Sequence, residues 1–272
     1  MTDRYAVIGN PIAHTKSPSL HAAFAQQSGQ DMHYGMILGP IDGFAEAVRQ
    51  FQHEGGKGMN ITVPFKLEAF KLADELTPRA RAAGAVNTFT FRDDGSILGD
   101  NTDGYGIVRD ITHNLGRSFT GKRVLLLGAG GAVRGALLPM LAENPSEIFI
   151  ANRTESKAVE FAREFGELAG NTKLSGGSFS EASGCFDIII NGTASSLMGE
   201  APPLPDGVWD ANSLAYDMYY KKEPTAFVLA AREAGVKLAT DGLGMVVEQG
   251  AESFYLWRGV RPDTAPVIAA LK

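Results

Sequence analysis

The feature that most constrains the fold is a short apolar run followed at once by a glycine-rich turn and a helical stretch. Residues 123–127 read Arg-Val-Leu-Leu-Leu, the pattern of a buried strand, and residues 128–135 read Gly-Ala-Gly-Gly-Ala-Val-Arg-Gly before the helical residues 136–142. Glycines let a backbone approach a pyrophosphate closely, and a helix N-terminus offers free amides and partial positive charge. The segment therefore predicts a dinucleotide-binding unit, although Val133 replaces the third glycine of G-x-G-x-x-G and a plain turn is the alternative.

Other strand-like runs alternate with amphipathic helical stretches, which is typical of a parallel α/β protein. The runs are residues 5–9, 58–63, 123–128, 147–152, 186–191 and 214–218. A chain of 272 residues is long enough for two domains, and the polar, glycine-rich stretch at residues 103–106 suggests where they divide. We expect an N-terminal α/β domain over residues 1–103 and a Rossmann-like domain over residues 104–239. Residues 240–272 form a tail whose helix has Val247, Ala251 and Phe254 at helical spacing, and we expect it to pack on one of the two domains.

Composition excludes several classes of function. A formal net charge of −6 argues against binding to nucleic acid or anionic lipid through a dense basic face. The single cysteine, Cys185, rules out an intramolecular disulfide, and the five histidines show no metal-ligand spacing, so we expect no metal. The N-terminus lacks the apolar segment of a signal peptide and no apolar stretch is long enough to span a bilayer, so we expect no membrane association and a cytoplasmic location.

The end of the second Rossmann strand indicates which dinucleotide binds. Residues 147–151 are followed by Asn152, Arg153 and Thr154, where an NAD-binding protein places an acidic residue for the ribose hydroxyls. A guanidinium can grip a ribose 2′-phosphate that a carboxylate would repel, so the sequence favours NADP. Lys157 either adds a second cation or is a solvated helix lysine. Thr193 follows the next strand at the sheet's carboxyl edge, where it either lines the cofactor cleft or caps a loop.

The N-terminal region offers polar candidates for a small-molecule substrate. Ser17 before Pro18 has the pattern of a helix N-cap, and its hydroxyl, with that of Thr15, can also meet a ligand. Period-two alternation over residues 59–63 puts Asn60 and Thr62 on one face, which is either a ligand face or a solvated one. Over residues 85–91, Asn87 shares a face with Ala85, Phe89 and Phe91, which predicts a buried amide that needs partners.

Lys66 and Asp103 are the candidate reactive pair. Pro64 ends a strand and the sequence predicts a helix directly after it, which places Lys66 in a first turn where the macrodipole disfavours a cation. Asp103 could offset that charge from another segment, or it could simply cap the next helix, and Lys66 could be an ordinary surface lysine. Since the chain lacks a G-x-S-x-G nucleophile motif, hydride transfer is the remaining chemistry.

Taken together, these motifs closely resemble the shikimate dehydrogenase family nearly from end to end. The matching segments are residues 9–12, 15–18, 60–66, 84–88, 99–104, 128–132, 152–154, 216–219 and 241–245. The resemblance implies reversible, NADPH-dependent reduction of 3-dehydroshikimate to shikimate in chorismate and aromatic amino acid biosynthesis, by a monomer or homodimer. It also implies that the tail returns to the N-terminal domain, which would bind the substrate.

The resemblance further implies a role for particular residues, with Lys66 and Asp103 as the catalytic pair. The substrate would contact Thr15, Ser17, Thr62, Lys66, Asn87, Asp103, Tyr219 and Gln249. NADP would contact Gly128, Ala129, Gly130, Gly131, Ala132, Asn152, Arg153, Thr154, Lys157, Thr193, Met218 and Gly242. The family often has serine in place of Thr15 and arginine in place of Lys157; both changes keep the needed groups, although a lysine cannot bind a phosphate in bidentate fashion.

Two alternatives remain open from the sequence. A quinate/shikimate dehydrogenase with relaxed cofactor use would share most motifs, although Arg153 and Thr154 speak against it. A non-catalytic relative could bind the ligand as a regulator on the same fold. Retention of both Lys66 and Asp103 disfavours that second alternative.

Overall fold

The computed structural model describes residues 2–271, and the chain divides into two compact units. The first runs to Gly106 and resumes at Val246, and the second is Ile107–Met245. The chain crosses between them inside two helices, α5 (Asp103–Arg109) and α9 (Leu243–Arg258), a few residues beyond the boundaries that the sequence predicts. Within residues 2–271, none of the helices combines the length and the apolarity that crossing a bilayer requires.

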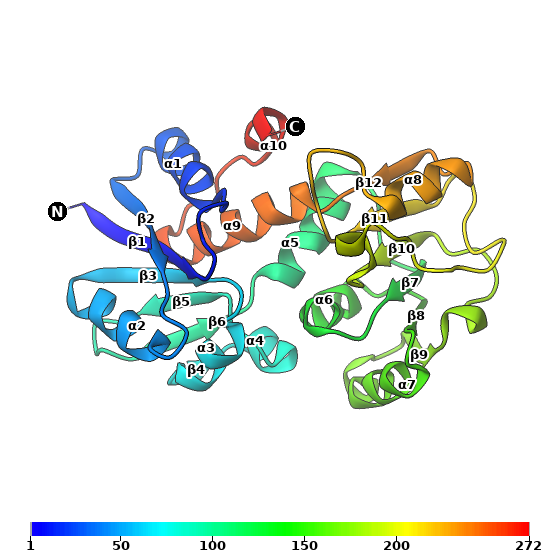
Figure 1. Ribbon diagram of the computed structural model, residues 1–272, viewed down its shortest axis with the longest axis horizontal. Coiled ribbons are helices and arrows are strands. Elements are labelled where there is room, and N and C mark those ends of the chain that lie inside the picture. Colours follow the sequence, from blue (N-terminus) through cyan, green and yellow to red (C-terminus); the bar gives the residue numbers. More distant parts are fainter. Residues whose placement is uncertain (1, 272) are drawn as a thin grey trace. The chain divides into compact units, whose positions relative to one another are not determined.

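The first unit contains a mixed six-stranded sheet of order β2-β1-β3-β5-β6-β4 (Figure 1). β1 pairs in parallel with β2 and β3, whereas β5 runs antiparallel to both β3 and β6. The strands are β1 (Asp3–Gly9), β2 (Met32–Leu38), β3 (Gly56–Ile61), β4 (Glu75–Leu76), β5 (Thr88–Phe91) and β6 (Ile97–Asp100). The helices within this unit are α1 (Ser17–Ser28), α2 (Phe44–His53), α3 (Lys66–Leu72), α4 (Pro78–Ala83) and α10 (Ala265–Leu271).

Helices cover both faces of this sheet, and the alternation along β1 shows how. Ala6 and Ile8 pack in a core with residues of α2, α3 and α4, whereas Tyr5 and Val7 belong to a cluster on the other face. On that second face, α1, α9 and α10 share their own apolar cluster. The stripe that the sequence predicts for the tail helix, Val247, Ala251 and Phe254, is fully buried there.

The second unit contains an all-parallel six-stranded sheet of order β12-β11-β10-β7-β8-β9 (Figure 1). Numbered from its first strand, this is the Rossmann order, so the predicted α/β class is confirmed. The strands are β7 (Arg123–Leu127), β8 (Glu147–Ala151), β9 (Lys173–Gly177), β10 (Ile188–Asn191), β11 (Leu214–Asp217) and β12 (Leu238–Thr240). The α-helices are α6 (Gly131–Ala142), α7 (Glu155–Glu164) and α8 (Ala226–Glu233), with a π-helical turn η1 (Asp110–Asn114) and the 3₁₀ turns η2 (Gly166–Leu168), η3 (Phe179–Glu181) and η4 (Ser195–Met198).

The sheet order fixes where a ligand can bind in this unit. β7 pairs with β8 on one side and with β10 on the other, so the connections leave the sheet in opposite directions between β7 and β10. Ligands of open α/β sheets bind at such a switch point, beyond the carboxyl ends of the strands. The turn after Leu127 and the turn after Asn191 both lie there.

Candidate functional site

The turn after β7 depends on glycine for its path. Gly128 has a φ of 108°, and a Cβ there would lie 3.2 Å from the carbonyl carbon and oxygen of Gly192. A Cβ added at Gly130 or Gly131 would meet nothing within 4 Å, so the space beside both glycines is open to a ligand. Helix α6 starts at Gly131, so the sequence prediction of an irregular turn through residue 135 was wrong, because only three residues precede the helix.

Val133 explains the imperfect glycine motif. Its side chain is fully buried, and a Cβ added at Gly192 would lie 2.4 Å from Val133 Cγ2. The third glycine of the motif normally allows close packing of helix against strand. Here the close approach is preserved by a glycine on the opposite side of the contact, Gly192.

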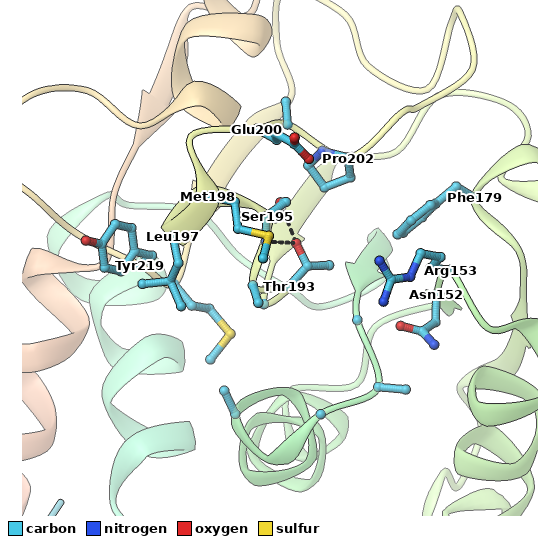
Figure 2. A pocket seen from close by; sticks show the side chains of 18 of the residues that line it. Asn152, Arg153, Phe179, Thr193, Ser195, Leu197, Met198, Glu200, Pro202 and Tyr219 are labelled. Carbon is cyan, nitrogen blue, oxygen red and sulfur yellow. Dashed lines mark hydrogen bonds between the residues drawn. The ribbon is translucent and has the colours of Figure 1, made fainter. Parts of the chain in front are cut away.

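These turns open onto a cavity of about 680 Å³ in the second unit (Figure 2). Most residues expected to contact the cofactor line it: Gly128, Ala129, Gly130, Gly131, Ala132, Asn152, Arg153, Thr193 and Met218. Tyr219, which was expected to contact the substrate, lines the same cavity. Thr154, Lys157 and Gly242 are absent from the lining; the first two are exposed at the start of α7, and Gly242 packs against the Met218 carbonyl.

Arg153 presents a free positive charge at this cavity. Its side chain is exposed beside Phe179 (Figure 2), and among residues 2–271 no carboxylate lies within ion-pair distance of it. The neighbouring Asn152 donates from Nδ2 to the Thr154 carbonyl over 2.9 Å, which holds the loop after β8. An unneutralised guanidinium on a glycine-lined cavity suits an additional phosphate.

One wall of the cavity was missed by sequence reasoning. Ser195, Leu197 and Met198 of η4 and the following residues 200–203 line it, together with Phe179. Ala201, Pro202 and Pro203 belong to a proline-rich loop that no sequence motif marks as part of the site. The position of this segment could have indicated its role, because it follows Thr193 at the carboxyl edge of the sheet.

The first unit brings Lys66 and Asp103 together. Lys66 Nζ lies 2.5 Å from Asp103 Oδ2, and both side chains are partly buried. Lys66 is the first residue of α3 and Asp103 the first of α5, so the cation that α3 disfavours at its N-terminus is neutralised from another segment.

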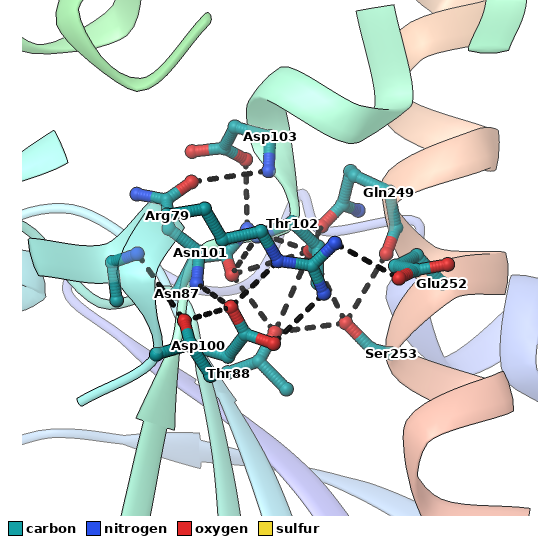
Figure 3. Close-up of polar contacts among 12 residues, drawn as sticks. Arg79, Asn87, Thr88, Asp100, Asn101, Thr102, Asp103, Gln249, Glu252 and Ser253 are labelled. Carbon is teal, nitrogen blue, oxygen red and sulfur yellow. Dashed lines mark hydrogen bonds and ion pairs between the residues drawn. The ribbon is translucent and has the colours of Figure 1, made fainter. Parts of the chain in front are cut away.

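Asn87 fixes the other oxygen of Asp103 (Figure 3). Its Nδ2 donates to Asp103 Oδ1 over 2.8 Å, and its Oδ1 accepts from the Thr102 amide over 2.9 Å and from the Thr88 hydroxyl over 2.8 Å. Gln249 Oε1, on α9, lies 3.4 Å from the same Nδ2. The predicted buried amide with partners is confirmed, since Asn87 is 2% exposed.

The predicted orientation of Asn87 was wrong. β5 begins only at Thr88, so strand alternation does not extend back to residue 87. Val86 joins Phe89 and Phe91 in the apolar core, whereas Asn87 bonds with residues on the α9 side. The chain bends just before β5, so the period-two alternation on which the prediction depended does not apply to Asn87.

The predicted capping role of Ser17 was also wrong. α1 begins at Ser17 itself, its N-cap is Lys16, and no side chain caps it. Instead the Thr15 hydroxyl donates to Ser17 Oγ over 3.1 Å, and Ser17 N donates to Thr15 Oγ1 over 3.3 Å.

A buried polar network lies behind these residues. The Tyr34 hydroxyl donates to Asn60 Oδ1 over 2.7 Å, and Asn60 Nδ2 donates to Ser253 Oγ over 2.9 Å. Burial raises the pKa of Tyr34 well above its usual value, against a hydrogen bond from Ser17 that lowers it. The face of Asn60 is therefore buried rather than solvated, and Ser253 was missed because the sequence does not show where α9 packs. Among the residues that the structure describes, no hydrogen bond connects Thr62 to this network, and the methyl group of Thr62 packs close to Gly9.

Among residues 2–271, no three His, Cys, Asp or Glu side chains are grouped to hold a metal ion. The polar cluster of the first unit therefore consists of an ion pair, amides and hydroxyls. Such a set can position a polyhydroxylated ligand and exchange a proton with it.

The fold and the site define a class of protein: an α/β protein with one Rossmann-type dinucleotide-binding unit and another α/β unit that carries a lysine–aspartate pair. Family models described as "Shikimate dehydrogenase substrate binding domain", "Shikimate / quinate 5-dehydrogenase" and "Shikimate 5'-dehydrogenase C-terminal domain" match residues 7–89, 110–198 and 242–272. The chain belongs to the shikimate dehydrogenase family.

Individual relatives cover the whole chain. The shikimate dehydrogenase (NADP(+)) of Aromatoleum aromaticum is 58% identical over 99% of this chain and 97% of its own. A crystal structure of an Ael1 enzyme from Pseudomonas putida is 52% identical, with a TM-score of 0.92 over 99% of this chain and 98% of that one. The Thermus thermophilus shikimate 5-dehydrogenase, solved with NADP(H) and shikimate, is 30% identical, with a TM-score of 0.85 over 98% of both chains.

Proposed function

We propose that this protein catalyses the reversible, NADPH-dependent reduction of 3-dehydroshikimate to shikimate, a step of chorismate and aromatic amino acid biosynthesis. The observation that carries the proposal is the Lys66–Asp103 pair, 2.5 Å apart and braced by the buried Asn87. It lies in a chain whose full-length relatives are named as NADP-dependent shikimate dehydrogenases. Because its cofactor is an intracellular metabolite, we propose that the enzyme acts in the cytoplasm.

The residues of the second unit fit NADP. Gly130 and Gly131 line the cavity at the N-terminus of α6, and the N-terminus of a helix stabilises a pyrophosphate. Arg153, with no carboxylate partner among the described residues, would bind the ribose 2′-phosphate, assisted by Asn152 and Thr154. Lys157 would add a more distant cation, and Thr193, Met218 and Gly242 would flank the nicotinamide end.

The residues of the first unit fit a small polyol acid. We propose that the paired hydroxyls of Thr15 and Ser17 bind the substrate carboxylate, and that Asn87 and Gln249 bind ring hydroxyls. Thr62 would contribute a further hydroxyl. We also propose a substrate contact for Tyr219.

When bound, NADPH supplies the hydride that the ring carbonyl carbon accepts. The Lys66 ammonium would donate a proton to the carbonyl oxygen as that oxygen gains charge, and Asp103 would hold the ammonium in place. Asn87 keeps Asp103 oriented through the second carboxylate oxygen. In the reverse direction the same lysine, unprotonated, would take the proton from the substrate hydroxyl.

The test is absorbance at the nicotinamide band with shikimate or quinate, each combined with NADP or NAD. We expect turnover largely confined to shikimate with NADP. Comparable rates with quinate or NAD would instead identify a quinate/shikimate dehydrogenase. No turnover with any combination, together with shikimate binding by calorimetry, would identify a non-catalytic regulator.

A further inference from the structure

A partly buried arginine connects two elements of the proposed substrate site without being part of it (Figure 3). Arg79, in the first turn of α4, donates from Nε to Asp100 Oδ1 over 2.7 Å and from Nη2 to Asp100 Oδ2 over 2.8 Å. Its remaining nitrogen, Nη1, donates to Glu252 Oε1 over 2.9 Å. All three nitrogens of one guanidinium are therefore used, two on the end of β6 and one on α9.

The two carboxylates that Arg79 contacts are almost completely shielded from solvent. The side chains of Asp100 and Glu252 are 6% and 7% exposed. Burial alone would lower the pKa of Arg79 and raise that of Asp100, but their mutual hydrogen bonds and charges shift both pKa values the opposite way. Buried ion pairs often add little net stability compared with apolar residues of similar shape. The network is therefore better explained by the geometry that it imposes.

Its first arm ends at the turn that carries Asp103. Asp100 Oδ1 accepts from the Asn101 amide over 2.7 Å and from the Thr77 hydroxyl over 2.6 Å. Asn101 in turn accepts from the Asp103 amide over 3.1 Å and donates to the Ala85 carbonyl over 3.0 Å. The position of the Asp103 backbone therefore follows from that of Asp100.

Its second arm ends on the helix that carries Gln249. Glu252 follows Gln249 by three residues on α9, and its second oxygen accepts from Arg261 Nη2 over 2.5 Å. Gln249 Oε1 lies 3.4 Å from both Asn87 Nδ2 and the Thr102 hydroxyl. A shift of α9 along the sheet would therefore move Gln249 away from Asn87.

We propose that Arg79 is a positioning residue, which holds the Asp103 turn and the Gln249 helix in one register and thereby presets the Lys66–Asp103 pair. The inference rests on the proposed function for its kinetic consequence. A displacement of a catalytic group by about 1 Å can lower turnover by on the order of 100-fold, even when the mutated residue touches no substrate. A lysine cannot replace Arg79, because the planar guanidinium donates from three nitrogens to two carboxylates, whereas an ammonium is a single point charge.

The experiment compares Arg79→Met and Arg79→Lys with the wild-type enzyme. The matched control is Arg92→Met, because Arg92 also pairs with a carboxylate, that of Glu75, but at an exposed site in the same unit. For each variant, kcat and KM for shikimate with NADP are measured at a temperature where circular dichroism shows fully folded protein. Amide hydrogen exchange of Asn101 and Asp103 is measured without ligands.

We expect kcat to fall at least tenfold in Arg79→Met, with a smaller fall in Arg79→Lys and wild-type values in Arg92→Met, and we expect both amides to exchange faster in the Arg79 variants. A folded Arg79→Met with a lower melting temperature but a kcat within about twofold of wild type would overturn the proposal. If Arg79→Met does not fold, the same criterion applied to Arg79→Lys decides.

Hydrogen exchange separates this inference from the proposed function. If wild-type enzyme turned over neither shikimate nor quinate, the proposed function would fail. Amide hydrogen exchange of Asn101 and Asp103 would still test whether Arg79 holds the Asp103 turn in place. Unchanged protection of the Asn101 and Asp103 amides in both Arg79 variants would then contradict the positioning role.

Discussion

His21 offers a test of how burial controls stability in the first unit. Its side chain is 1% exposed, and its ring stacks on Tyr34 with centroids 4.0 Å apart and planes 6° apart. Burial lowers the pKa of His21 to about 3, against a hydrogen bond with Asn60 that raises it. The ring is therefore neutral in the folded protein at pH values where an unfolded histidine, with a pKa of about 6.5, takes up a proton.

The sign of the effect follows from proton uptake. Below about pH 6.5 the histidine of the unfolded chain binds a proton, whereas His21 in the folded chain binds one only near pH 3. The free energy of unfolding should therefore fall with decreasing pH across that window, by about 1.4 kcal/mol per unit. Between pH 8 and pH 5, His21 alone should remove about 2 kcal/mol of stability.

The assay is urea unfolding from pH 8 to pH 5 of wild type and His21→Phe, which keeps a ring against Tyr34 and cannot titrate. Trp257 lies 5.5 Å from His21 between ring centroids, so its fluorescence reports on this unit once Trp209 is replaced by phenylalanine. His33→Gln, at an exposed position on β2, is the control and should keep the wild-type slope. Equal pH slopes in His21→Phe and wild type would show that His21 does not cause the loss of stability.

Two further predictions concern the second unit, Ile107–Met245. Arg153→Ala should raise KM for NADP by on the order of 10- to 100-fold and change KM for NAD little, because a charged hydrogen bond to a phosphate contributes roughly 1.5–3 kcal/mol. Equal effects on both cofactors, in steady-state kinetics, would show that Arg153 does not select the 2′-phosphate. Gly242→Ala should lower the free energy of unfolding by about 1–3 kcal/mol, since its Cβ would lie 2.3 Å from the Met218 carbonyl oxygen; an unchanged thermal transition would mean that the Met218 loop yields freely.

Elements with strong local patterns were predictable from the sequence. The strand of residues 123–127 and the helix stripe of Val247, Ala251 and Phe254 follow from periodicity alone. The Lys66–Asp103 pair was predictable for a different reason, since a cation in the first turn of a helix needs an offsetting charge.

Other features depend on where separate segments meet, which periodicity does not record. Asn87 turns toward α9 because the chain bends before β5, and Arg79 lies in a helix of six residues with no pattern of its own. The cavity wall at residues 195–203 consists of a short 3₁₀ turn and a proline-rich segment, neither of which has a periodic sequence pattern. These contacts are set by tertiary packing, so only the structure reveals them.

In the proposed mechanism, Lys66, held by Asp103, carries the proton in shikimate oxidation by NADP. The most direct test is steady-state kinetics of Lys66→Met beside Lys71→Met, which removes an exposed lysine from the same helix. We predict that kcat falls by on the order of 100- to 10,000-fold in Lys66→Met, with a much smaller change in KM for shikimate, while Lys71→Met retains wild-type kinetics. A folded Lys66→Met that turned over shikimate at close to the wild-type rate would contradict the claim.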